Sequence, residues 1–186
     1  GSVVTWGDSS YGGDSSAVAA QIDGTIDVTQ VFSSVGAFAA LRADGSVVTW
    51  GNVDYGGDSR AVAAALDGTI DVTQVFSTEY AFAALRADGS VVTWGKGGGG
   101  DSSTVATKLD GTIDVTQVFS TQYAFAALRA DGSVVTWGDN RYGNLGGDSG
   151  AVATKIDGTI DVTQLISTGW AFAALRADGS VDRKST

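Results

Sequence analysis

Hydrophobic side chains fill neighbouring positions, not only alternate ones, in two short segments that flank an Asp-Gly pair. The first segment reads AFAALRA (37–43) and the second reads SVVTW (46–50). Successive side chains of a strand point to opposite faces of a sheet, so a hairpin made from these segments is apolar on both faces. Such a hairpin must be covered on both faces, which favours sheets that stack on one another.

The Asp-Gly pair between two strand-like segments predicts a tight turn. We favour a type I turn over Ala43 and Asp44, with Gly45 in the left-handed conformation. A two-residue type I′ turn on Asp44 and Gly45 is the alternative, and it would shift the register of the hairpin by one residue.

Two further segments precede the hairpin. DVTQVFS (27–33) is rich in β-branched and aromatic residues, which predicts a third strand. The segment before it, DSSAVAAQIDG (14–24), is ambiguous. Its alanines, its Asp/Ser start and its Asp-Gly end favour one or two helical turns, and a fourth strand is the alternative.

The same pattern occurs four times along the chain. The glycines at its turns lie 44, 44, 43 and 47 residues apart, at Gly1, Gly45, Gly89, Gly132 and Gly179. A period in the forties marked by Trp and Gly is typical of β-propeller blades. We therefore predict an all-β propeller that forms a single repeat domain over residues 1–186, with units at about 8–51, 52–95, 96–138 and 139–181.

The two ends of the chain suggest how the propeller closes. The last unit runs from Val181 into Asp182-Arg183-Lys184, where the other units continue with VTWG, whereas residues 1–7 read GSVVTWG. We predict that the N-terminal segment pairs with residues 171–177 and completes the last blade, which would also cover an exposed strand edge. An open arc and one half of a larger ring are the alternatives.

The residues after the hairpin carry a family resemblance. DGSVVTWGDNRYGNLG (131–146) resembles the signature of the regulator-of-chromosome-condensation repeat, and VFSTQYAFAAL (118–128) looks like the strand pair that precedes it. The chain departs from that family at Thr121-Gln122, where the family has two glycines, and at Ala124, where it has a histidine. The resemblance implies a propeller of usually about seven blades that acts through its surface, as in nucleotide exchange on a small GTPase, chromatin docking or inhibition of a β-lactamase.

Composition narrows the classes of partner. Lys and Arg number 11 against 21 Asp and Glu, for a net charge of −10, and this balance repels phosphate backbones and anionic membranes. Cys and His are absent, so the sequence offers no disulfide and no Cys/His metal site. The apolar runs are far shorter than the ~18 residues of a membrane-spanning helix. We expect no cofactor, no nucleic-acid partner, no membrane partner and no small-molecule ligand.

The sequence offers few candidate catalytic, metal-binding or phosphate-binding residues. General acid–base catalysis has no histidine to use, and the Asp residues recur in turns and at strand starts, so we predict no enzymatic activity. The D-G-T-I-D element at 23–27 could supply calcium ligands, but a structural role in a turn is favoured. The glycine-rich segment 95–102 lacks the fixed Gly-Lys-Ser/Thr order of a phosphate-binding loop.

The tryptophans divide into two groups. Trp6, Trp50, Trp94 and Trp137 have the same place in every hairpin, so we assign them to the core and not to a sugar-binding platform. Trp170 lies in a turn instead, and we expect it to be partly exposed.

Two short regions differ between units while the strands barely change. One follows each WG pair, at 8–13, 52–57, 96–100 and 139–147, and the other precedes each AFAAL, at 35–36, 79–80, 122–123 and 169–170. In an antiparallel hairpin both regions should lie at the same end, opposite the ADG turns. Loops can vary because few packing contacts constrain them, and they can vary because they recognise a partner.

The variable regions supply the candidate interaction surface. Aromatic and Arg residues are frequent interface anchors, and the candidates are Tyr11, Tyr55, Glu79, Tyr80, Tyr123, Arg141, Tyr142 and Trp170. We predict a non-enzymatic protein-interaction or scaffold module whose partner is another protein or copies of itself. The alternatives are a self-assembling segment of a large extracellular or surface protein and a glycan-binding module, and a location outside the cell or on its surface is slightly favoured.

Overall fold

Each unit folds into a small antiparallel sheet. The computed structural model describes residues 1–139, 146–179 and 181–182. The strands are β1 (Val28–Ser33), β2 (Ala37–Arg42), β3 (Val47–Gly51), β4 (Val72–Ser77), β5 (Ala81–Arg86), β6 (Val91–Gly95), β7 (Val115–Ser120), β8 (Ala124–Arg129), β9 (Val134–Gly138), β10 (Val162–Ser167), β11 (Phe172–Arg176) and β12 (Val181–Asp182). They form four three-stranded sheets in sequential order, which confirms the predicted all-β class and the three strands of each of the first three units.

The ambiguous alanine-rich segments are helical. The described 3-10 helices are η1 (Ser9–Tyr11), η2 (Ser16–Gln21), η3 (Val53–Tyr55), η4 (Arg60–Ala65), η5 (Ser103–Lys108) and η6 (Gly150–Lys155). In η2 the amide of Val18 donates to the carbonyl of Ser15, and the Asp14 carboxylate accepts from the amide of Ser16 at 2.9 Å. The favoured helical interpretation of residues 14–24 is therefore confirmed. Within the described ranges, no helix is long and apolar enough to cross a membrane.

The hairpin turn has the favoured geometry. Gly45 has φ of 74°, its amide donates to the carbonyl of Arg42 at 3.0 Å, and Leu41 pairs with Val47. The bond from Gly45 to Arg42 is the i to i+3 bond of a turn centred on Ala43 and Asp44, and the left-handed position falls on the glycine. The alternative two-residue turn is excluded.

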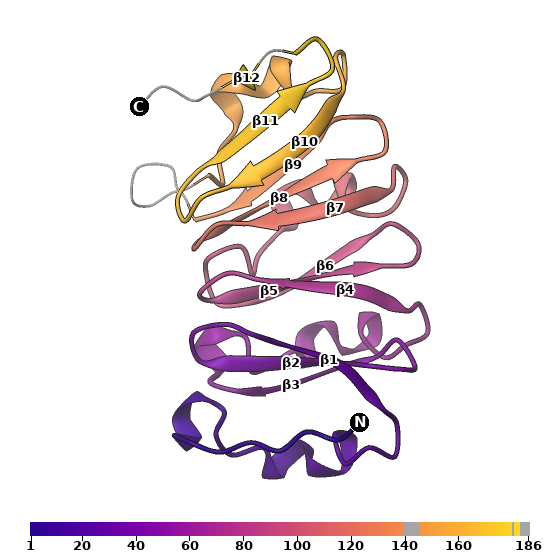
Figure 1. The fold of residues 1–186 in the computed structure, drawn as a ribbon, viewed down its shortest axis with the longest axis vertical. Coiled ribbons are helices and arrows are strands. Elements are labelled where there is room, and N and C mark those ends of the chain that lie inside the picture. The colour runs from indigo at the N-terminus through magenta and orange to yellow at the C-terminus, as the bar shows by residue number, and fades with distance from the viewer. Residues whose placement is uncertain (140–145, 180, 183–186) are drawn as a thin grey trace.

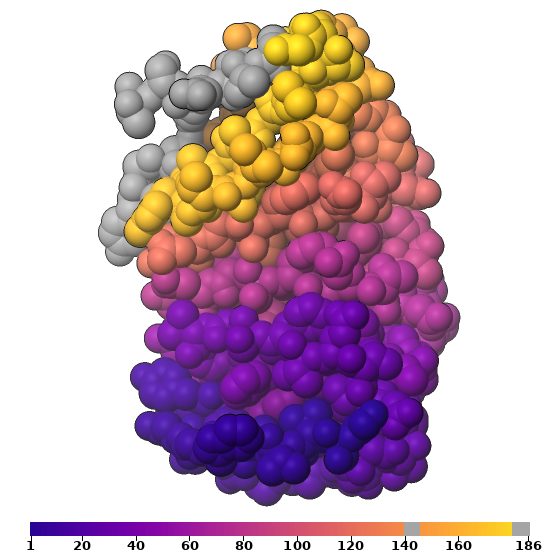
Figure 2. All heavy atoms as spheres, viewed as in Figure 1, coloured from indigo at the N-terminus to yellow at the C-terminus, as the bar shows by residue number. Residues whose placement is uncertain are grey.

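The sheets stack face to face along the long axis of the molecule (Figure 1). One face of the β2 strand, at Ala37, Ala39 and Leu41, packs against Phe82 and Val75 of the next sheet. The neighbouring junctions repeat this arrangement, so both apolar faces of an inner sheet are covered by its neighbours. In the space-filling view the units form layers of one column (Figure 2).

The inner tryptophans lie in the core. Trp50, Trp94 and Trp137 are at most 4% exposed, in agreement with their predicted role. The Trp94 indole Nε1 donates to the carbonyl oxygen of Gly56 at 3.1 Å. Gly56 has φ of +93°, and a Cβ there would lie 2.7 Å from the Phe82 ring. The glycine is thus required both for its left-handed backbone and for its close approach to the core.

Trp6 departs from the predicted core set. It is 84% exposed, and the N-terminus of the chain lies at one end of the stack (Figure 1). Trp50 in the equivalent position is 4% exposed because it packs in a core cluster with Ile22 and Val48, and its Nε1 donates to the carbonyl of Gly12 in the layer beneath.

The structure also corrects the predicted ring closure. Residues 1–7 and β11 lie at opposite ends of the stack (Figure 1). The carbonyl of Gly1 accepts from the Val28 amide at 2.8 Å, and the Val3 amide donates to Ile22 at 2.9 Å. The N-terminal segment therefore packs locally beneath its own first sheet, through the contacts that every later unit makes with the next. Instead of that segment, β12 pairs with β11.

Candidate functional site

The two variable regions lie at one edge of the stack, which we call the loop edge. Ala37 pairs with Gly51, and the Asn52 amide donates to the carbonyl of Gly36 at 2.8 Å. This pairing holds the residues after WG beside the turn that precedes AFAAL. The ADG turns lie at the other end of each hairpin, beyond the pair Leu41 and Val47, and we call that side the turn edge.

Five aromatic side chains form a ladder along the loop edge. The aromatic ladder consists of Tyr11, Tyr55, Tyr80, Tyr123 and Trp170. Neighbouring ring centroids are separated by 6.3 Å, 5.1 Å, 5.6 Å and 5.7 Å in that order. The inner two pairs are stacked, with interplanar angles of 18° and 24°. These distances lie within the favourable range for aromatic pairs, so the ladder links one unit to the next.

The ladder is a half-buried surface feature. Tyr11 is 49% exposed and Trp170 is 55% exposed, whereas the three rings between them are partly buried. Tyr80 lies between Tyr55 and Tyr123, so its neighbours cover its ring faces. A partner would meet ring edges in the middle of the ladder and more open ring faces at its ends. This geometry suits contact with a protein better than the flat stacking of a sugar.

An acidic side chain belongs to the same surface. A hydrogen bond with the Glu79 carboxylate, together with desolvation and the negative charge of Glu79, raises the pKa of Tyr123 to about 12. The Tyr123 hydroxyl is the donor in this bond. Glu79 therefore ties two neighbouring units together beside the aromatic rings.

Backbone hydrogen bonds connect the turns beneath the ladder. The Val35 amide donates to the carbonyl of Glu79 at 3.3 Å, and the Glu79 amide donates to Gln122 at 2.9 Å. The Gln122 amide donates in turn to Gly169 at 2.9 Å. The turns of successive units are thus fixed relative to one another, and the ladder rests on a regular backbone.

A recurring hydroxyl joins the two variable regions, and the sequence analysis missed it. Ser34 Oγ donates to the carbonyl of Tyr55 at 2.7 Å, and Thr78 Oγ1 donates to Gly98 at 2.9 Å. Thr78 Oγ1 also accepts from the amide of Ala81 at 3.1 Å. The signal for this role was a Ser or Thr directly before each variable turn, at 34, 78, 121 and 168.

The structure gathers most of the predicted surface residues in one place. Tyr11, Tyr55, Glu79, Tyr80, Tyr123 and Trp170 all belong to the ladder or contact it. The two other candidates, Arg141 and Tyr142, lie outside the described residues.

The repeated acidic elements form turns. Asp23 Oδ1 accepts from the Thr25 amide at 2.8 Å, and Asp67 makes the same bond to Thr69 at 2.8 Å. These backbone bonds lower the pKa of both aspartates. Among the residues that the structure describes, no group of three or more acidic side chains is placed to hold a metal ion. The favoured structural role of D-G-T-I-D accounts for these bonds.

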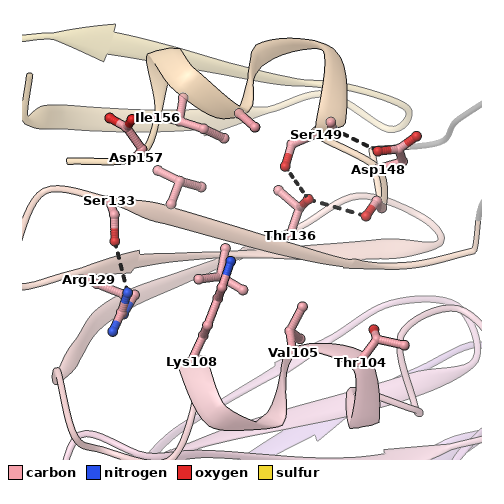
Figure 3. A pocket seen from close by; sticks show the side chains of 15 residues that line it. Thr104, Val105, Lys108, Arg129, Ser133, Thr136, Asp148, Ser149, Ile156 and Asp157 are labelled. Atoms are coloured by element: carbon pink, nitrogen blue, oxygen red, sulfur yellow. Dashed lines mark hydrogen bonds between the residues drawn. The ribbon is translucent and has the colours of Figure 1, made fainter. Parts of the chain in front are cut away.

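A groove of about 490 Å³ lies between η5 and η6. Figure 3 shows Val105 and Lys108 on one side of it and Ser149 and Ile156 on the other. Thr136 Oγ1 lies 2.9 Å from Ser149 Oγ, so these two hydroxyls of the lining are hydrogen-bonded to each other. A similar groove of about 470 Å³ occurs between η2 and η4. Both grooves thus lie between the short helices of successive units.

Comparison with known proteins supports the resemblance. Residues 115–144 match the family of the regulator of chromosome condensation (RCC1) repeat. No curated protein matches the chain at a significant level. The match spans β7 to β9 and a few residues beyond, and it supports the interpretation that the units are RCC1-like repeats.

Solved structures share the fold at low identity. Yeast RCC1 (Prp20) bound to Kap60 has a TM-score of 0.54 and 18% identity over 83% of this chain and 42% of that one. The CRINKLY WD40 ectodomain of the Arabidopsis thaliana receptor kinase ACR4 has a TM-score of 0.56 and 17% identity over 89% of this chain and 58% of that one. A second structure of Prp20p, from Saccharomyces cerevisiae, has a TM-score of 0.55 and 18% identity over 83% and 43%. The chain thus spans roughly half of each of these proteins.

Proposed function

We propose that the chain is a non-enzymatic protein-interaction module that binds its partner through the loop edge. The observation that carries this proposal is the aromatic ladder, which crosses the units in sequence regions that vary while the strands stay the same. Tyr and Trp are enriched where protein interfaces derive most of their binding energy, because each buries a large rigid area and keeps a polar group.

The rigidity of the loop edge supports the proposal. Binding costs less when the contact residues are ordered beforehand, since fewer rotamers and loops are immobilised on association. The backbone bonds between turns and the Ser34 and Thr78 hydroxyls provide that order. The loop edge therefore resembles a preformed surface more than a flexible one.

The similar proteins and the charge indicate the kind of partner. One structure of Prp20 contains Kap60, and another is described by its binding to Gsp1p and histones, so RCC1-like folds serve as protein-binding surfaces. For this chain, the net charge of −10 and the Glu79 carboxylate favour a partner with a basic surface. The same charge disfavours nucleic acid, and we expect no salt-sensitive duplex binding in a gel shift.

A site-specific cross-linking experiment tests the proposal. A photo-crosslinking amino acid replaces Tyr80 in the ladder or Gln74, which is exposed on β4 away from the ladder. We expect the Tyr80 position to capture a defined protein partner and the Gln74 position to capture none. Capture at Gln74 alone would place binding elsewhere on the sheets.

Substitutions then measure the contribution of the surface to affinity. Tyr80→Ser combined with Trp170→Ser should weaken binding of the captured partner at least about tenfold, the effect of losing one well-packed interface anchor. Gln74→Ser is the matched control and should bind like the parent. Equal affinity of the ladder variant and the parent would contradict the proposal, provided both retain their circular dichroism spectra.

A further inference from the structure

The third strand of a unit is an edge strand of its sheet. In the third unit the strand order is β7-β8-β9, so β9 pairs with β8 on one side. Among the described residues, no strand pairs with its other side, which we call the outer edge of β9. The backbone amides and carbonyls along such an edge are available to pair with another extended chain.

The pairing of β8 with β9 shows which backbone groups face the outer edge. The amide of Arg129 donates to the carbonyl of Ser133 at 2.9 Å, so these two residues form a hydrogen-bonded pair. Such pairs alternate with non-hydrogen-bonded pairs along an antiparallel ladder. Thr136, which lies opposite Ala126, occupies a non-hydrogen-bonded position. Its amide and its carbonyl therefore point away from β8.

The neighbouring residues support this direction. Two residues earlier on β9, the amide of Val134 also points outward and donates to the carbonyl of Ile156 at 2.8 Å. Neither the amide nor the carbonyl of Thr136 has a backbone partner beyond the sheet among the described residues. The Thr136 side chain is already engaged, since its Oγ1 donates to the carbonyl of Gly147 at 3.2 Å. The outer edge thus offers one backbone donor and one backbone acceptor at Thr136.

A groove gives access to this edge. Val134 and Thr136 line the groove of about 490 Å³ between η5 and η6, and its volume lies within the usual range for ligand sites. Figure 3 shows the strand that carries Thr136 running between the two helices. Val91 and Thr93, at the equivalent edge of β6, are only 7% and 9% exposed. Val134 and Thr136 are partly exposed, so the outer edge of β9 is the more open of the two.

The charges of the groove favour an acidic ligand. Lys108 on η5 is exposed, and it takes part in no ion pair among the described residues. Arg129 is held by Asp131, whose carboxylate lies 3.6 Å from Nη1. The acidic side chains that line the groove, Asp148 and Asp157, each accept a backbone amide of their own turn. Lys108 is therefore the charge that is available to a carboxylate of a ligand.

We infer that the groove between η5 and η6 binds an extended, acidic peptide segment of a partner protein along the outer edge of β9. The residue opposite Thr136 exchanges two backbone hydrogen bonds with it, as in an antiparallel sheet. A carboxylate of the segment pairs with Lys108. Backbone bonds give such a complex its affinity, and the side chains give it selectivity. This site is separate from the loop edge, whose partner we expect to be basic.

A titration followed by nuclear magnetic resonance tests this inference. The probe is the blocked peptide Val-Glu-Val-Glu-Val, and the control peptide carries lysine in place of both glutamates. We expect the glutamate peptide to shift the amide signals of residues 104–108 and 134–138 and to bind more tightly than the lysine peptide. The net charge of −10 attracts the lysine peptide to the rest of the surface, so a preference for glutamate isolates the charge of Lys108.

Two variants of Thr136 test the backbone pairing. Thr136→Pro removes the outward amide, and proline is tolerated on an edge strand whose N–H faces away from the sheet. Thr136→Val keeps the amide and loses the hydroxyl, so it is the matched control. We expect Thr136→Pro to bind the glutamate peptide about two- to tenfold more weakly than Thr136→Val, the effect of one hydrogen bond. If Thr136→Pro lowers the melting temperature, a peptide with N-methyl groups on its inner amides replaces it and should show the same loss.

Variants of two lysines test the charge. Lys108→Gln installs the residue found at the equivalent position of the first unit, Gln21, and should weaken the glutamate peptide about two- to fivefold, the range of an exposed ion pair. Lys155→Gln removes the same charge from a residue that does not line the groove, and it should bind like the parent. Tyr80→Ser should also bind like the parent, so failure of this inference leaves the proposed function intact.

Three results would overturn the inference. One is a titration with the glutamate peptide that leaves the amide signals of residues 134–138 unchanged. Another is binding of the lysine peptide that equals or exceeds that of the glutamate peptide. The third is equal affinity of Lys108→Gln and the parent for the glutamate peptide.

Discussion

Two columns of aromatic side chains run along this molecule and have different roles. In the inner column, which covers the first three hairpins, a Phe stacks on the Trp of the same hairpin, as Phe82 does on Trp94 at 5.3 Å with both rings buried. In the outer column the tyrosines of the aromatic ladder stack from unit to unit at the loop edge and stay partly exposed. The inner column holds each layer in place, and the outer column presents a surface. The two columns differ in burial and in residue type, since the inner one consists of Phe and Trp and the outer one of four Tyr and one Trp.

The largest expected effect comes from the inner column. Trp94→Ala should lower the free energy of unfolding by about 3–5 kcal/mol, because it removes a buried ring and leaves a cavity. Denaturant titration followed by circular dichroism measures this change. A loss below about 1 kcal/mol would mean that the inner column does not support the stack.

A glycine beside the inner column should have the next largest effect. Gly56→Ala forces an L-residue into φ of +93° and directs its Cβ to within 2.7 Å of Phe82. We expect a loss of about 1–3 kcal/mol, the usual cost of such a backbone conformation, with some further cost from the contact. Gly150→Ala is the matched control, since φ there is not left-handed and the nearest atom is a carboxylate oxygen. Equal stability of both variants would contradict this role of Gly56.

The outer column should matter less for stability. Tyr80→Ser removes two stacking contacts of a partly buried ring, and we expect a loss of about 1 kcal/mol, seen as a fall of a few degrees in the melting temperature. A loss as large as that of Trp94→Ala would erase the distinction between the two columns. The ladder would then be part of the core.

The smallest expected effect is a change in the pH at which the Tyr123 hydroxyl ionises. The pKa of Tyr123 is raised to about 12, so the folded state favours its neutral form. This contribution to stability is complete below pH ~10, the ordinary tyrosine value, and is lost as the pH rises towards 12. Ultraviolet absorbance should show a tyrosine that ionises at high pH, which Glu79→Gln shifts to lower pH and Tyr11→Phe leaves unchanged. If a tyrosine still ionises at the same high pH in Glu79→Gln, its raised pKa has a cause other than Glu79.

The strands and turns could be predicted from the sequence because they depend on local chemistry. Apolar residues on both faces of residues 37–50 required stacked sheets, and the Asp-Gly pair placed the left-handed residue at Gly45. The short alanine-rich segments were correctly read as helical. Their 3-10 form follows from bonds such as that from Val18 to Ser15.

The arrangement of the ends could not be predicted in the same way. The complementary sequences of residues 1–7 and 171–177 indicate that they fit together, but not that they meet within one chain. That depends on the rotation from one sheet to the next, which is set by how Ala37 and Ala39 pack against rings such as Phe82. The pattern of apolar residues in the sequence does not determine the rotation angle between successive sheets.

The sequence predicted the aromatic residues of the candidate surface but not their stacking or the hydroxyls beneath them. Variable aromatic positions pointed to Tyr80, Tyr123 and Trp170, yet their stacking into a ladder depends on the spacing of the layers. The hydroxyls of Ser34 and Thr78 were missed because they are invariant in type beside a variable turn and resemble ordinary turn residues.

Hydrogen exchange of the free and partner-bound chain compares the two edges most directly. If the loop edge binds the partner, amides in residues 52–57 and 79–81 should exchange more slowly in the complex, while those in the ADG turns at 43–46 and 87–90 should be unchanged. Protection confined to the ADG turns, with no change along the aromatic ladder, would contradict the account.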